Sequence, residues 1–117
     1  MELNHVSLPT GRNHFKHMRD FYLNILSPFG YHVLTEHEGG FCGFQSRHRG
    51  PDFWLHRGEE EFPPIDRNAT ADEITKGRGR THLGFELGSR RLVDEWYRNA
   101  LWVSTLHLMN CSYGALI

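Results

Sequence analysis

An internal repeat constrains the fold of this chain more than any other feature. Residues 5–26, HVSLPTGRNHFKHMRDFYLNIL, and residues 82–101, HLGFELGSRRLVDEWYRNAL, each read as a strand followed by a helix. The opening residues, His5 and His82, lie 77 positions apart, whereas the helix residues Phe21 and Trp96 lie 75 apart. The two-residue difference falls in the connecting loop, where changes of length are tolerated. The repeat predicts two units whose apolar faces complete one another.

The first copy is followed by enough chain for a complete module. Polar and apolar residues alternate over 3–8, which predicts a strand. Apolar residues then recur at steps of three and four as far as Leu26, which predicts a helix with Asn13 as its N-cap and with Pro28 and Gly30 at its end. Three short strands are expected at residues 31–35, 41–45 and 52–56, with turn residues between them.

The second copy has much less chain after it. Alternation over residues 81–87 predicts a strand, and apolar spacing from Leu92 to Leu101 predicts a helix capped by Ser89. Only 16 residues follow Leu101, too few for three strands, and they offer candidate strands at 102–108 and 113–117. We therefore expect an α+β fold in which paired βαβββ modules form a curved mixed sheet and the second module is incomplete. Module one spans residues 1–57, a polar linker spans 58–80, and partial module two spans 81–117, all within one domain.

Charge and apolar content narrow the function classes. Thirteen Lys and Arg against fourteen Asp and Glu leave no basic excess for nucleic acid. No apolar run approaches the roughly 18 residues of a membrane span, and the first residues lack a signal-peptide pattern, so a cytoplasmic location is expected. Cys42 and Cys111 are interpreted as unpaired small thiols. Of nine histidines, His5, His56 and His82 lie in strand-like segments, and His14, His17, His32, His37 and His48 are assigned to solvated faces.

The segments NHVSLPT, DFYLNILSPFGY, PDFWL, THLGFEL and DEWYRNAL occur in this order between residues 2 and 101. Their order resembles the glyoxalase, bleomycin-resistance and extradiol-dioxygenase superfamily, also called vicinal oxygen chelate proteins. The resemblance implies a cup-shaped sheet that holds a divalent metal (Zn, Ni, Mn or Fe) and an oxygen-rich small molecule. His5 and His82 match the two strand histidines that bind the metal in that superfamily. Two imidazoles and a carboxylate leave open positions on a metal for a pair of substrate oxygens.

The sequence departs from the superfamily pattern near its end. The third metal ligand in that superfamily is commonly a glutamate within a stretch like DPDGNNIE, and no such stretch occurs here. The terminal SYGALI is similar to the strand that precedes that glutamate, so the chain is expected to be a C-terminally truncated member. His56 and Glu86 are candidate substitutes for the missing carboxylate.

Three functions stay open on the sequence. The first is a metal-dependent lyase or dioxygenase with His5 and His82 as metal ligands. The second is a metal-free module that binds a small molecule, with Phe44, Trp54, His56 and Phe85 as ligand-binding residues. The third is an inactive truncated paralogue that is held together as a homodimer.

Overall fold

The computed structural model describes residues 4–38, 40–46, 50–61 and 83–110. The chain divides into two compact units, residues 1–62 and 63–117, and the boundary falls within the segment predicted as a linker. Each unit is described by itself. Among the helices of the described ranges, none is long and apolar enough to cross a bilayer.

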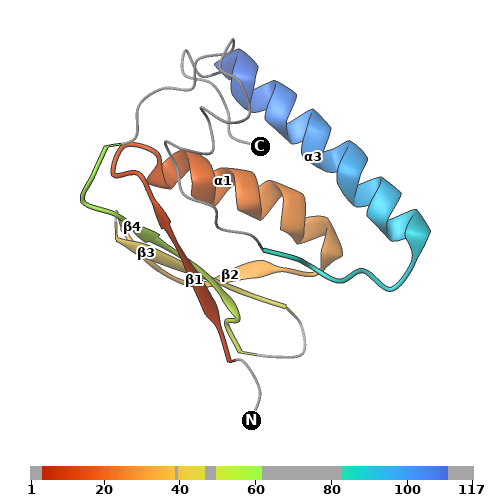
Figure 1. Ribbon diagram of the computed structural model, residues 1–117, viewed down its shortest axis with the longest axis horizontal. Coiled ribbons are helices and arrows are strands. Elements are labelled where there is room, and N and C mark those ends of the chain that lie inside the picture. Colours follow the sequence, from red (N-terminus) through yellow and green to blue (C-terminus); the bar gives the residue numbers. More distant parts are fainter. Residues whose placement is uncertain (1–3, 39, 47–49, 62–82, 111–117) are drawn as a thin grey trace. The chain divides into compact units, whose positions relative to one another are not determined.

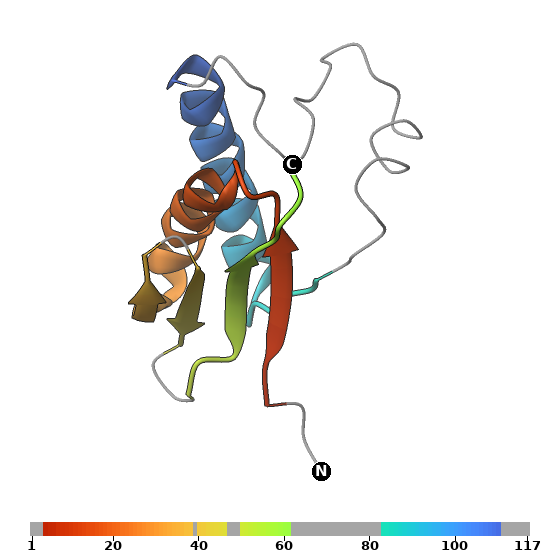
Figure 2. The same cartoon turned by 90° about the vertical axis from the view of Figure 1, so that its left-hand side faces the viewer.

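The first unit has the element order that the sequence predicts. Strand β1 (Val6–Thr10) precedes helix α1 (Phe15–Leu26) and the 3-10 turn η1 (Ser27–Phe29), after which come β2 (His32–His37), β3 (Phe41–Gln45) and β4 (Phe53–Arg57). The strands form one sheet in the order β1-β4-β3-β2. β1 runs parallel to β4, and the other two pairs are antiparallel. Helix α1 covers one face of this mixed sheet (Figures 1 and 2).

Local signals at the end of α1 act as predicted, but those at its start do not. Pro28 lies in η1, and Gly30 takes the left-handed conformation with φ 95°, which terminates the helix. The N-cap is His14 and not Asn13, and the His14 side chain makes no capping hydrogen bond. The backbone N–H of His14 donates to the carbonyl of Gly11, so a tight turn delays the helix. His14 is also nearly buried, at 9 % exposed, which corrects its assignment to a solvated face.

The core of the first unit lies between α1 and the sheet. Phe44 and Phe53 stack with ring centroids 5.4 Å apart, and Tyr22 of α1 meets Phe53 edge-on at 4.8 Å. Burial raises the pKa of the Tyr22 hydroxyl. The most deeply buried apolar side chains of this core are Ile25, Leu26, Cys42, Phe44, Phe53 and Leu55.

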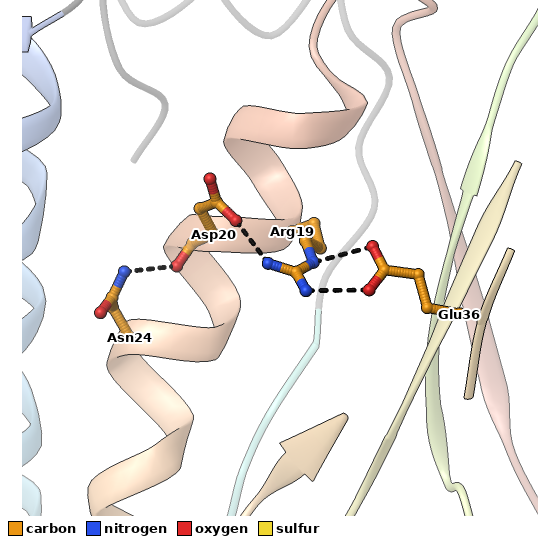
Figure 3. Close-up of polar contacts among 4 residues, drawn as sticks. All are labelled: Arg19, Asp20, Asn24 and Glu36. Carbon is orange, nitrogen blue, oxygen red and sulfur yellow. Dashed lines mark hydrogen bonds and ion pairs between the residues drawn. The ribbon is translucent and has the colours of Figure 1, made fainter. Parts of the chain in front are cut away.

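An ion-pair network joins α1 to the edge strand β2 (Figure 3). The Arg19 guanidinium donates to both carboxylate oxygens of Glu36, at 2.9 and 2.8 Å, and to Asp20 at 2.8 Å. The Asn24 side chain donates to the backbone carbonyl of Asp20. These bonds raise the pKa of Arg19, with the Glu36 hydrogen bond as the largest cause. The network fixes Glu36 on the side of the sheet that α1 covers.

The second unit differs from the sequence prediction in two elements. Residues 83–87 form no strand, and helix α3 (Arg90–Asn110) continues through residues 102–108, which the sequence predicts as a strand. A strand needs neighbouring backbone groups to bond, and no strand of the described ranges pairs with either segment. No Gly or Pro interrupts 90–110, so extending the existing helix satisfies the backbone locally. The predicted strand at 113–117 lies outside the described residues.

The predicted start of the second helix is confirmed. The Ser89 hydroxyl accepts a hydrogen bond from the backbone N–H of Leu92 at 3.4 Å, which is the geometry of an N-cap. The fold is therefore α+β, with one four-stranded mixed sheet and a second module that is incomplete in the described residues.

Candidate functional site

The face of the sheet opposite α1 carries the candidate site. Strand residues alternate between the two faces, and Phe53 and Leu55 of β4 are buried on the α1 side. Trp54 and His56 therefore lie on the other face, opposite Ser7 and Pro9 of β1 and opposite Gly43 and Phe41 of β3. We call this surface the open face. It comprises His5, Ser7, Pro9, His32, Thr35, His37, Phe41, Gly43, Gln45, Trp54 and His56.

Trp54 lies flat at the centre of the open face because Gly43 leaves room for it. A Cβ atom on Gly43 would stand only 2.9 Å from two atoms of the six-membered ring of Trp54. The indole N–H also donates to the carbonyl of Pro51 at 3.1 Å. The two contacts hold the indole from below and from one end, so its orientation is set without a ligand.

Other rings surround Trp54. His5 meets it edge-on with centroids 6.4 Å apart, and Phe41 lies 6.0 Å away at a tilt of 50°. His37 in turn stacks on Phe41 at 5.6 Å. Phe41 is 41 % exposed and therefore adds accessible apolar surface to this group. The result is a continuous aromatic surface across three strands.

Two imidazoles of the open face have defined hydrogen-bond partners. His56 Nδ1 lies 2.8 Å from Ser7 Oγ, a bond that links β4 to β1. His5 Nδ1 lies 2.8 Å from the amide oxygen of Asn4. An amide oxygen only accepts, so this bond forms in the His5 tautomer that has its proton on Nδ1, and in that tautomer Nε2 holds the lone pair. This is the tautomer in which an imidazole can bind a metal or accept a proton.

The structure brings together some of the predicted site residues. His5, Trp54 and His56 share the open face. Phe44 lies on the opposite side of the sheet, where it is 0 % exposed and stacked on Phe53. Phe85 belongs to the second unit, where it lies in the segment before α3. His82 lies outside the described residues, as do Cys111 and His48.

Sequence reasoning missed three residues of this surface as site residues. The alternation over residues 3–8 puts Ser7 on the same face as His5, but the hydrogen bond from Ser7 to His56 depends on the β1–β4 register, which no local pattern contains. Phe41 and His37 reach the open face through the β2–β3 and β3–β4 registers. Alternation along β3 puts Phe41 on the same face as Gly43, which was the available signal for Phe41.

The charge of the site is asymmetric across the sheet. Glu36 is the one acidic residue within the four strands, and it faces α1, where it pairs with Arg19. Histidines contribute imidazoles to the open face from β2, from β4 and from just before β1. The strand residues of the open face therefore offer hydrogen-bond donors and aromatic surface but no carboxylate.

The described residues contain neither a group of three metal ligands nor an exposed thiol. No group of three or more His, Cys, Asp and Glu side chains is arranged there to hold a metal ion. The Cys42 thiol is fully buried, and burial raises its pKa to about 11, so it is a core residue and not a nucleophile.

Comparison with protein families and with curated proteins found no match. No protein-family model matches the chain. No curated protein matches it significantly either. The superfamily resemblance therefore stays a prediction from the sequence.

Proposed function

We propose that this protein binds a small planar molecule on the open face, with the indole of Trp54 as the stacking surface. The proposal rests on the packing of the Trp54 indole against Gly43 and on the hydrogen bond from the indole N–H to the Pro51 carbonyl. Together these contacts fix the orientation of the ring. This role corresponds to the metal-free binding module implied by the resemblance to bleomycin-resistance proteins.

A fixed aromatic ring is an efficient ligand contact. Binding normally costs free energy because side chains must be ordered, and a ring that is already held avoids that cost. An aromatic pair contributes about 0.5–1.5 kcal/mol beyond the area that it buries. Phe41 and His5 flank the indole and extend the surface over which a ring can lie.

Tryptophan fluorescence tests the proposal. The chain has three tryptophans, so a variant with Trp96→Phe and Trp102→Phe leaves Trp54 as the only reporter. We expect 2-naphthamide, a neutral planar probe, to quench this signal saturably, and we expect EDTA to leave the titration unchanged. In calorimetry on the otherwise native chain, Trp54→Leu weakens binding about tenfold or more.

The matched control is Trp102→Phe, because Trp102 is 63 % exposed on α3 and belongs to the other unit. It should bind 2-naphthamide as the native chain does. If Trp54→Leu binds the probe as tightly as this control, the open face is not the site.

A divalent metal at His5 is the second candidate, in line with the lyase or dioxygenase role implied by the resemblance. It is favoured by the Asn4 bond, which leaves His5 Nε2 able to coordinate. Structural and catalytic zinc sites use three or four protein ligands, and His82, the predicted partner of His5, lies outside the described residues. A bound metal would act there as a Lewis acid toward substrate oxygens.

Elemental analysis separates the two candidates. The metal function predicts Zn, Ni, Mn or Fe in the purified native chain and its loss from a His5→Ala/His82→Ala double variant. His17→Ala, which alters an exposed imidazole of α1, is the matched control. Equal metal content in all three proteins would eliminate the metal function.

A further inference from the structure

We infer that the ligand of the open face is an aromatic anion, a planar ring that carries a carboxylate. This inference rests on the proposed function and specifies its ligand. It follows from the charge of the surface around Trp54 and from the placement of two polar side chains beside that ring.

The strand residues of the open face include no acidic side chain that could pair with a cation. Aromatic faces attract cations only weakly at exposed sites, and a carboxylate partner adds a charge-assisted hydrogen bond to a cation. The strands contain one carboxylate, Glu36, and it is committed to Arg19 on the far side of the sheet, with oxygens 2.9 and 2.8 Å from the guanidinium nitrogens. Just before β4, the carboxylate of Asp52 accepts a hydrogen bond from the Tyr31 hydroxyl at 3.2 Å. The open face instead carries the imidazoles of His5, His32, His37 and His56. Imidazoles can donate hydrogen bonds through N–H and carry no negative charge.

Ser7 and His56 supply a suitable anchor for a carboxylate. Ser7 lies opposite Trp54 in the parallel ladder, and its hydroxyl bonds His56 Nδ1 at 2.8 Å. When Ser7 donates this bond, the remaining ring nitrogen of His56 must carry a proton and can donate to an anion. Both side chains are exposed, so the donor is accessible to a ligand.

The spacing of the ring and the anchor suits a small aromatic acid. Trp54 and His56 are two residues apart on one strand, which separates them by about 7 Å on the same face. A two-ring aromatic acid spans a distance of this order, so its rings can stack on Trp54 while its carboxylate reaches His56. Hydrogen bonds from an imidazole to a carboxylate are charge-assisted when the imidazole is protonated, and such bonds are about twice as strong as neutral ones.

Three probes of one shape and different charge test the inference: 2-naphthoate, 2-naphthamide and 2-(aminomethyl)naphthalene. We expect the native chain to bind the naphthoate about tenfold more tightly than the amide, and the ammonium compound least tightly. In His56→Gln the preference for naphthoate over amide should fall about fivefold or more, while the affinity for the amide stays unchanged. His17→Gln, on the exposed side of α1, is the matched control and should keep the native preference.

The relative affinities of the three probes distinguish failure of this inference from failure of the proposed function. Equal affinity for naphthoate and amide, or tighter binding of the ammonium compound, overturns the inference but leaves the proposed function standing. Failure of all three probes to bind overturns the proposed function itself. Should His56→Gln unfold, Ser7→Ala serves as the second variant, because it removes the partner of the imidazole, and an unchanged naphthoate preference in it would contradict the anchor.

Discussion

At the scale of single residues, Gly43 determines whether Trp54 can lie on the sheet. Its hydrogen is the only substituent that fits beneath the indole, since the first carbon of any side chain would overlap the ring. The φ of Gly43 is not in the left-handed region, so the requirement is one of space and not of backbone conformation. Sequence alone marked Gly43 only as part of a strand.

Gly43→Ala is expected to displace the indole and to lower the free energy of unfolding by about 1–3 kcal/mol, the usual cost of overpacking. Urea denaturation measures the loss, and a change in Trp54 fluorescence reports the displacement. Gly50→Ala is the control, because a Cβ there meets no atom within 4 Å, and it should stay within about 0.5 kcal/mol of the native chain. Equal effects of the two substitutions would show that Trp54 does not rest on Gly43.

Cys42 provides a second prediction at this scale. Burial, followed by the nearby Glu36 carboxylate, raises the pKa of its thiol from 9.0 to about 11. The unfolded chain therefore loses the thiol proton at lower pH than the folded chain does. The thiol's contribution to the free energy of unfolding is complete below about pH 9 and is lost as the pH rises toward about 11.

The measurement is the difference in unfolding free energy between the native chain and Cys42→Ala as pH rises through this window. The difference should narrow with increasing pH, because only the native chain carries the thiol, while tyrosines such as Tyr22 titrate in both proteins. A difference that is constant from pH 8 to pH 11 would contradict the raised pKa.

At the scale of elements, apolar packing and the Arg19 network together hold α1 against the sheet. The Arg19–Glu36 pair is bidentate and roughly one-third exposed on each side, whereas the Arg90–Asp94 pair of α3 is an i,i+4 contact with the arginine 87 % exposed. Exposed pairs are screened by solvent and contribute little, so the two pairs should differ in energy.

A double-mutant cycle measures each pair. We expect Arg19→Met and Glu36→Gln to show a coupling energy of about 1 kcal/mol, at the upper end for partly exposed pairs. Arg90→Met and Asp94→Asn should show about 0.3–0.5 kcal/mol, the value typical of helix-surface pairs. A coupling at Arg19–Glu36 no larger than that at Arg90–Asp94 would mean that the network does not help to attach α1 to β2.

Local sequence patterns predicted some of the helices and strands correctly and others wrongly. Strand and helix patterns placed all five regular elements of the first unit, and the Ser89 cap placed the start of α3. They failed at residues 83–87 and 102–108, where the predicted strands depend on partner strands that local pattern does not supply. Helices satisfy their own backbone and strands do not, so helix predictions are less dependent on the rest of the chain.

At the scale of the whole molecule, the sheet of the first unit has two central and two edge strands. β4 and β3 are paired on both sides, whereas β1 and β2 each have one neighbour in the described part of the chain. Both edges carry features that discourage further pairing. Pro9 lies in β1, and a register shift between Val33 and Thr35 interrupts β2.

Amide hydrogen exchange should distinguish the central strands from the edge strands. We expect the amides of β3 and β4 to exchange about tenfold more slowly on average than those of β1 and β2, because central strands open only with the unit as a whole. Mass spectrometry of peptides from each strand measures the rates. Protection of β1 equal to that of β4 would indicate that a further strand pairs with the β1 edge.

Sequence by itself determined the strand-helix-strand-strand-strand order of the first unit, because periods of two and of about 3.6 residues are properties of neighbouring positions. Only the tertiary structure decided which face of each strand is buried. Phe44 and Trp54 are both aromatic strand residues in the sequence, yet α1 packs over Phe44 and leaves Trp54 on the open face. Alternation states that successive side chains point to opposite faces, but the helix that chooses between the faces acts through contacts between residues distant in the chain.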